Sequence, residues 1–129
     1  MLTPPARLLL RLDSVAGLCV GVVVLALTPW LATLYAMPEP WVRGMGLANL
    51  AYGAASGVLA WRAVRGLDVS RRAVTTLGLA NVSWAAVCLV LAGVFVGDAS
   101  SVGVAMLLAE ALFVGGLGVA EWRWARPAG

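Results

Sequence analysis

One carboxyl group interrupts an apolar stretch near the end of the chain. Glu110 lies in the segment from residue 99 to residue 120, which contains no other charged residue. If this segment is a helix that crosses a bilayer, Glu110 lies about 15 Å from the end near Ser100, close to the bilayer centre. A charged side chain at that depth costs about 2.5–3.5 kcal/mol on insertion scales. We therefore expect Glu110 to face the protein interior, a partner or a water-filled cavity.

Two interpretations of Glu110 remain open from the sequence. A protonated glutamic acid would hydrogen-bond to a neighbouring helix and hold the bundle together. Alternatively, Glu110 is an intramembrane titrating site that carries a proton or a cation, as ionisable residues inside membranes often do. Both interpretations require polar partners at the depth of Glu110.

Two stripes of polar residues supply candidates for such partners. Tyr52 and Cys88 are expected at the same depth as Glu110, and each belongs to a set with helical spacing, which places its members on one helix face. The sets are Asn49, Tyr52 and Ser56 on one segment, and Asn81, Trp84 and Cys88 on another. These residues either enclose one polar pocket with Glu110 or form separate interhelical hydrogen-bond seams.

The sequence lacks the residues that most catalytic and metal sites use. It has no histidine, and its two cysteines do not form a C-x-x-C motif, which excludes imidazole chemistry, histidine-ligated haem and thiol–disulfide exchange of that type. Cys19 and Cys88 are expected at depths that differ by about 13 Å, so we expect two free thiols. We predict that the protein is not an enzyme and binds no cofactor or metal.

The composition is that of a membrane protein rather than a water-soluble globule. Of the 129 residues, 62% are apolar and 12% are charged, and the mean hydropathy is +0.95. Soluble domains are typically about 45–50% apolar and about 25% charged. The length allows one domain, residues 1–129.

Charged residues separate four apolar stretches, each long enough to cross about 30 Å of hydrocarbon as a helix. We predict an all-α polytopic membrane protein, a bundle of four transmembrane helices spanning residues 13–36, 42–64, 73–96 and 100–122. The apolar stretches are continuous and not alternating, which excludes a transmembrane β-barrel. In this arrangement Asp13 caps the start of the first helix near water, beside Arg11.

The arginines predict the orientation of the chain in the membrane. All nine basic residues are arginine, and only Arg43 falls on the side opposite the termini. By the positive-inside rule, both termini are cytoplasmic in a multi-pass protein of the cell membrane, here a bacterial inner membrane. The net charge of +3 is then a topology signal, and no nucleic-acid partner is required. Tryptophans mark both interfaces: Trp30 and Trp41 on one side, and Trp61, Trp122 and Trp124 on the other.

The second and fourth predicted spans end alike. The segments AWRAVR (residues 60–65) and EWRWAR (residues 121–126) share the pattern W-R-x-x-R. This suggests a duplicated two-helix unit whose copies are related by an axis along the membrane normal, as in parallel-repeat transporters. Alternatively, Trp followed by Arg simply anchors the cytoplasmic end of a helix.

The tripeptide Thr28-Pro29-Trp30 lies at the turn of the first predicted hairpin. In this respect the first 65 residues resemble the SPW-repeat family of small bacterial membrane proteins, in which a Ser-Pro-Trp occupies that position. The second hairpin has AGVFVGD at its turn and no such tripeptide. The resemblance implies a four-helix membrane protein and no particular activity.

Small residues predict close helix packing. Gly17 and Gly21 in the first span, and Gly53 and Gly57 in the second, have the spacing that lets helix backbones approach within a membrane. These faces either pack within one chain or form a homodimer. The expected partners are therefore the lipid bilayer and, if any, a second copy or another membrane protein.

Two functions remain compatible with the sequence. The first is a small structural or accessory membrane protein without catalytic chemistry, whose interior polar groups specify packing. The second is a small transporter or proton-coupled channel that uses Glu110 as its titrating site. They differ in whether Glu110 faces a hydrated cavity or a dry helix contact.

Overall fold

The computed structural model describes residues 2–125, which form helices and connecting segments without a strand. In chain order the elements are α1 (Pro4–Ala26), α2 (Thr28–Tyr35), α3 (Glu39–Val64), α4 (Arg71–Phe95), α5 (Ser101–Ala120) and the π-helical turn η1 (Glu121–Ala125). The all-α fold expected from the sequence is therefore present.

Three helices begin at hydroxyl caps. The side chains of Thr3, Ser70 and Ser100 each accept a hydrogen bond from a backbone N–H three residues later, at the starts of α1, α4 and α5. Such caps satisfy backbone donors that have no partner within the helix. Pro4 and Pro5 follow Thr3, in the first turn, where a missing N–H costs nothing. α1 thus starts nine residues before the predicted position 13.

The first predicted span, 13–36, is wrong as a single helix. It is divided at Leu27 into α1 and the shorter α2. Pro29 has no N–H to continue the helical hydrogen bonds. The Thr28 hydroxyl instead donates to the Val24 carbonyl oxygen at 2.8 Å. The remaining predicted boundaries differ by a few residues: α3 begins at Glu39, α4 spans 71–95, and α5 passes into η1 at Glu121.

The helices form two hairpins, α1 with α3 and α4 with α5, and contacts within each hairpin far outnumber those between hairpins. Glycines make both contacts possible. A Cβ added to Gly53 would lie 2.6 Å from the Leu18 backbone nitrogen, and one added to Gly118 would lie 2.7 Å from the Gly78 carbonyl oxygen. Gly17 and Gly21 meet α3 in the same way, and Gly57 meets Ser14. The predicted glycine faces therefore pack within one chain.

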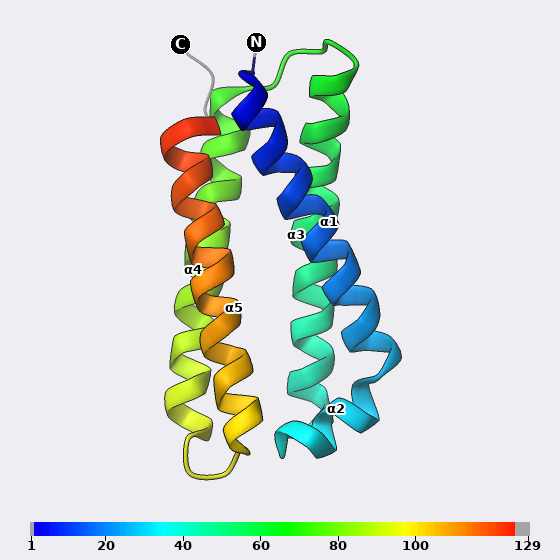
Figure 1. Cartoon of the computed structure of the whole chain (residues 1–129), viewed down its shortest axis with the longest axis vertical. Coiled ribbons are helices and arrows are strands. Elements are labelled where there is room, and N and C mark those ends of the chain that lie inside the picture. The colour runs from blue at the N-terminus through cyan, green and yellow to red at the C-terminus, as the bar shows by residue number, and fades with distance from the viewer. Residues whose placement is uncertain (1, 126–129) are drawn as a thin grey trace.

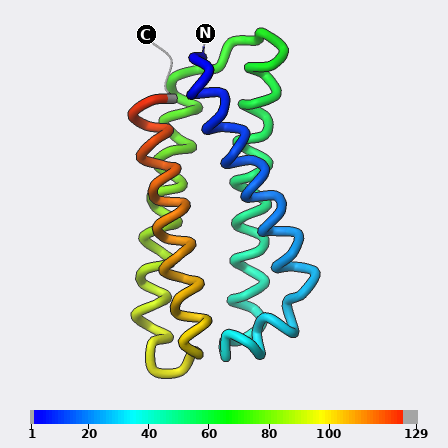
Figure 2. Tube along the Cα trace, viewed as in Figure 1, coloured from blue at the N-terminus to red at the C-terminus, as the bar shows by residue number. Residues whose placement is uncertain are grey.

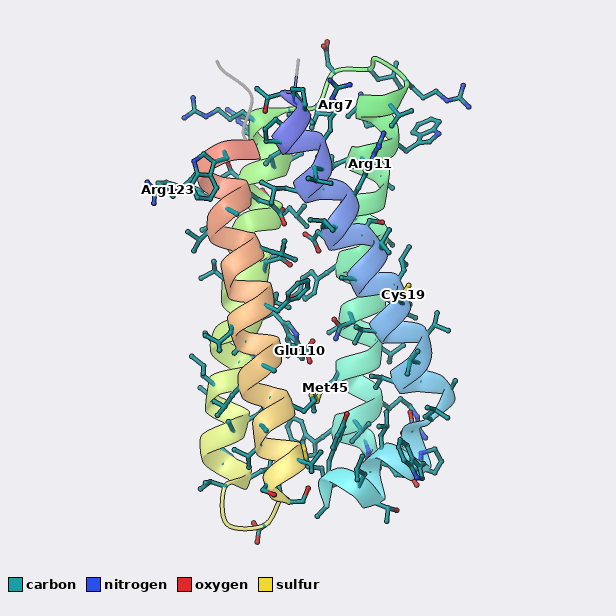
Figure 3. All side chains as sticks on the ribbon, viewed as in Figure 1. Arg7, Arg11, Cys19, Met45, Glu110 and Arg123 are labelled. Carbon is teal, nitrogen blue, oxygen red and sulfur yellow. The ribbon has the colours of Figure 1, made fainter. Side chains whose placement is uncertain are left out.

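The two hairpins lie side by side, and the start of α1 and η1 lie at the same end of the bundle (Figure 1). We call this the arginine-rich end, because Arg7, Arg11 and Arg123 lie there (Figure 3). The opposite end, with α2 and residues 96–100, is the α2 end (Figure 2). There Ser100 joins the hairpins: its hydroxyl donates to the Leu34 carbonyl at 2.7 Å and its N–H to the Tyr35 carbonyl at 2.9 Å.

The outer surface of the bundle is apolar. Large side chains such as Val90, Val94 and Leu112 are exposed on it, and so are the five tryptophans predicted at the interfaces. Three helical segments, Pro4–Ala26, Arg71–Phe95 and Ser101–Trp124, are long and apolar enough to cross a membrane. These features indicate a membrane protein. α3 has the length but less apolar character, since it contains Asn49, Tyr52 and Ser56, so the count of four spans remains a prediction.

Candidate functional site

Glu110 lies on α5 at mid-height of the bundle and points toward the space between the hairpins (Figure 3). Its carboxyl oxygen Oε1 accepts a hydrogen bond from Asn49 Nδ2 of α3 at 2.5 Å and one from Trp84 Nε1 of α4 at 3.2 Å. Hydrogen bonds to charged acceptors contribute about 1.5–3 kcal/mol, enough to offset much of the cost of a buried carboxylate. Both donors reach the same oxygen of the carboxyl group.

A cavity of about 260 Å³ separates the hairpins and includes Glu110 in its lining. Its polar lining residues are Asp13, Tyr35, Asn49, Tyr52, Asn81 and Glu110, and the others are mainly small or aliphatic residues of α1, α3 and α5. Most small-molecule pockets measure roughly 300–1,000 Å³. At about 260 Å³ the cavity lies just below this range, which limits an occupant to a compact molecule. Glu110 is part of the lining of this cavity.

Only some members of the two predicted polar stripes line this cavity. Asn49 and Tyr52 line it, and the Tyr52 ring packs at 6.3 Å from the ring of Trp84. Ser56 is fully buried and donates within its own helix, to the Tyr52 carbonyl at 2.9 Å. Cys88 is buried in the apolar core at the α2 half of the bundle. Asn49 and Trp84 are the members that reach Glu110.

Asn81 belongs to a second cluster of polar groups nearer the arginine-rich end. Its Nδ2 atom donates to Asp13 Oδ2 at 2.8 Å and to Glu121 Oε1 at 3.2 Å. Asp13, Asn81 and Glu121 are 5%, 1% and 0% exposed. The expectation that Asp13 caps a helix start near water is wrong: α1 begins at Pro4, and this places Asp13 about 14 Å along the helix, inside the bundle.

The charges around the cavity favour a cationic occupant. Within residues 2–125, the cavity lining includes two carboxyl groups and no arginine. The only ion pair in this range is Glu39 with Arg43, exposed at the α2 end, so no arginine neutralises Asp13 or Glu110. Tyr35, Tyr52 and Phe113 add aromatic rings to the lining. Carboxylates with aromatic faces are the groups that bind ammonium cations in proteins.

Two residues of this region are not among those selected from the sequence. Glu121 precedes the Trp-Arg-Trp segment, which indicated a membrane interface and gave no sign of a buried acid. In the structure Glu121 is fully buried. The π-helical turn that begins at Glu121 departs from α-helical spacing, so side-chain direction there does not follow from the sequence. Tyr35 is the second, and its position in the lining depends on the break at Leu27. Its aromatic ring near a predicted helix end was the available signal.

Other predicted features have these positions. Cys19 is exposed on α1 and Cys88 is buried on α4, and both are free thiols. No group of three or more Cys, Asp or Glu residues that could hold a metal ion occurs among residues 2–125. Arg126, the last residue of the second W-R-x-x-R pattern, lies outside the described residues.

We compared the chain with known proteins. No protein-family model, curated protein or solved structure matches it.

Proposed function

We propose that this protein is a small membrane carrier that binds a monovalent cation at Glu110, either a proton or a small organic ammonium. The observation that supports it most strongly is the position of Glu110, whose carboxyl group lines a cavity between two hairpins at mid-height of the bundle. The size and acidic, aromatic lining of the cavity favour a compact ammonium with an apolar group.

A single carboxyl group in such a cavity couples the binding of the proton to the binding of the ammonium. Glu110 can hold a proton or pair with an ammonium, and the two states exclude each other because each neutralises the same charge. If Glu110 releases the ammonium on one side of the membrane and then binds a proton before the site faces the other side again, the protein exchanges an ammonium for a proton. The protein would be a proton-coupled antiporter.

The packing of the bundle fits movement of one hairpin against the other. Each hairpin is tightly packed through glycines, whereas the contacts between the two hairpins are fewer. At the α2 end Ser100 meets Tyr35, and at the other end Asn81 bridges Asp13 and Glu121. Opening one end while the other stays closed would expose Glu110 to each side in turn, as in other transporters built from repeats.

We also propose that the two hairpins are copies of one duplicated unit and that four helices cross the membrane. Asn49 and Glu110, which bond across the cavity, are 61 positions apart, and the same offset relates Gly17 to Gly78, Gly57 to Gly118 and Trp61 to Trp122. With this offset α3 corresponds to α5, so we propose that α3 also crosses the membrane. The arginine-rich end then lies in the cytoplasm of the cell, where the positive-inside rule places both termini.

Uptake into liposomes tests the proposed function. With purified protein in vesicles that are acidic inside, we expect uptake of benzyltrimethylammonium that saturates with concentration and stops when the pH gradient is removed. Benzoate, an anion of similar size, should not be taken up beyond the level of protein-free vesicles. Benzyltrimethylammonium uptake equal to that of protein-free vesicles would contradict the proposal.

A structural or accessory function is the second candidate, and one observation favours it. Glu110 accepts hydrogen bonds from α3 and from α4, so it joins the two hairpins. In that case Glu110 is a fixed interhelical contact, and no cation crosses the membrane. The second candidate predicts a stable bundle without uptake.

A further inference from the structure

The buried cluster at the arginine-rich end contains two carboxyl groups, and no basic side chain among residues 2–125 forms an ion pair with either of them. Asp13 and Glu121 both bond to one atom, because Asn81 Nδ2 donates to Asp13 Oδ2 at 2.8 Å and to Glu121 Oε1 at 3.2 Å. Two ionised carboxylates in contact, away from water, repel each other strongly, and such pairs hold one proton between them.

An unpartnered oxygen shows where that proton belongs. Glu121 Oε2 is buried and, among the residues that the structure describes, accepts no hydrogen bond. A proton on Oε2 would turn it into a donor toward Asp13, while Oε1 continues to accept from Asn81. The two acids and the amide would then form a connected set of hydrogen bonds that carries one negative charge.

The charged groups on the neighbouring elements do not replace this proton. Arg11 of α1, Arg72 of α4 and Arg123 of η1 are exposed, and within residues 2–125 none of them forms an ion pair with Asp13 or Glu121. On α5 the nearest titratable group is Glu110, eleven residues before Glu121 and therefore about 16 Å away along the helix. α3 contributes Arg62, which donates instead to the Asp68 carbonyl at 3.0 Å.

We propose that Asp13 and Glu121 share one proton and form a second proton-binding site at the arginine-rich end of the cavity. Asn81 is its positioning residue. Asp13 also lines the cavity that contains Glu110, so water that enters this cavity would reach the pair and exchange protons with it. A role of this pair in proton transfer to the cavity rests on the proposed carrier function, whereas the sharing of one proton by Asp13 and Glu121 does not.

Infrared spectroscopy can detect the shared proton without a transport assay. Of the six acids in the chain, Glu39, Asp68 and Asp98 are exposed, and exposed carboxyls are ionised at neutral pH. In a Glu110→Gln background, any carbonyl-stretch band of a protonated carboxyl group at pH 7.5 must therefore come from Asp13 and Glu121. We expect one such band, shifted in D₂O.

Substitutions assign the band. Adding Glu121→Gln or Asp13→Asn should remove it, since each leaves a single carboxylate that accepts a hydrogen bond from a neutral amide. Adding Glu39→Gln should leave it unchanged. Circular dichroism identifies any variant that fails to fold, and either substitution alone is sufficient for the assignment.

The proposal is overturned if the band is absent in Glu110→Gln protein, or if it persists in both folded variants of the pair. The band is measured in Glu110→Gln protein and the uptake in wild-type protein, so a band without wild-type uptake leaves the pair in place and contradicts the carrier function. Wild-type uptake without the band in Glu110→Gln protein would retain the carrier function and contradict the shared proton.

Discussion

Glu110→Gln protein should take up no more benzyltrimethylammonium than protein-free vesicles. Glutamine can still accept hydrogen bonds from Asn49 and Trp84 through its amide oxygen, so the bundle should fold. The change in unfolding free energy should not exceed about 0.6 kcal/mol, the average for interhelical hydrogen bonds in membranes. The amide neither carries charge nor titrates, so both cation binding and proton exchange are lost.

The matched control is Glu39→Gln, the same chemical change in an exposed ion pair with Arg43 at the α2 end. Exposed pairs contribute at most about 1 kcal/mol, and Glu39 does not line the cavity. This variant should keep wild-type uptake. If Glu110→Gln transports as well as wild type, Glu110 is only an interhelical contact.

Gly53→Leu should have the largest effect on stability, because the first hairpin has no space for a side chain there. A Cβ at this position would lie 2.6 Å from the Leu18 nitrogen and 2.9 Å from the Gly17 carbonyl carbon. Both are backbone atoms, so α1 and α3 must separate. Overpacking of cores typically costs about 1–3 kcal/mol, and we expect a loss at the upper end of this range or beyond in detergent unfolding measurements.

Gly116→Leu is the control for this prediction. Gly116 lies on α5 within a membrane-length helix, and nothing lies within 4 Å of a Cβ added there. Its replacement should leave the unfolding free energy within about 0.5 kcal/mol of wild type, as for most surface substitutions. Equal stability of the two variants would show that α1 and α3 do not approach through glycine.

The sequence predicted the helices well because their signals are local. Apolar runs between charges located the long helices. Helical spacing indicated that Asn49 and Tyr52 share one helix face, and both residues line the cavity. The glycine spacing predicted where α1 and α3 meet, since small residues are needed for close approach wherever backbones cross.

The second acidic cluster could not be predicted in the same way, because it depends on contacts between distant segments. Thr3 and the two prolines extend α1 by about two and a half turns before the predicted start, and this extension moves Asp13 from the expected interface into the interior. The π-helical turn redirects Glu121 toward Asn81. Asn81 was expected to share a helix face with Trp84 and Cys88, but it lies about one helical turn from Trp84, toward the arginine-rich end.

The proposed carrier function requires that Glu110 faces a cavity that water and cations enter. Cysteines introduced beside Glu110 on two faces of α5 test it directly, in protein whose own Cys19 and Cys88 are replaced by alanine. Both positions are exposed, but Ala109 lines the cavity, whereas Leu112, 79% exposed on the apolar outer surface, is not part of that lining. In vesicles, a thiol ionises and reacts with a charged thiosulfonate reagent only where water reaches it.

We predict that a positively charged thiosulfonate modifies Ala109→Cys protein much faster than Leu112→Cys protein, and that benzyltrimethylammonium slows this modification. Equal, slow modification at both positions, or a rate at position 109 that the cation does not change, would contradict the existence of a cation-binding cavity at Glu110.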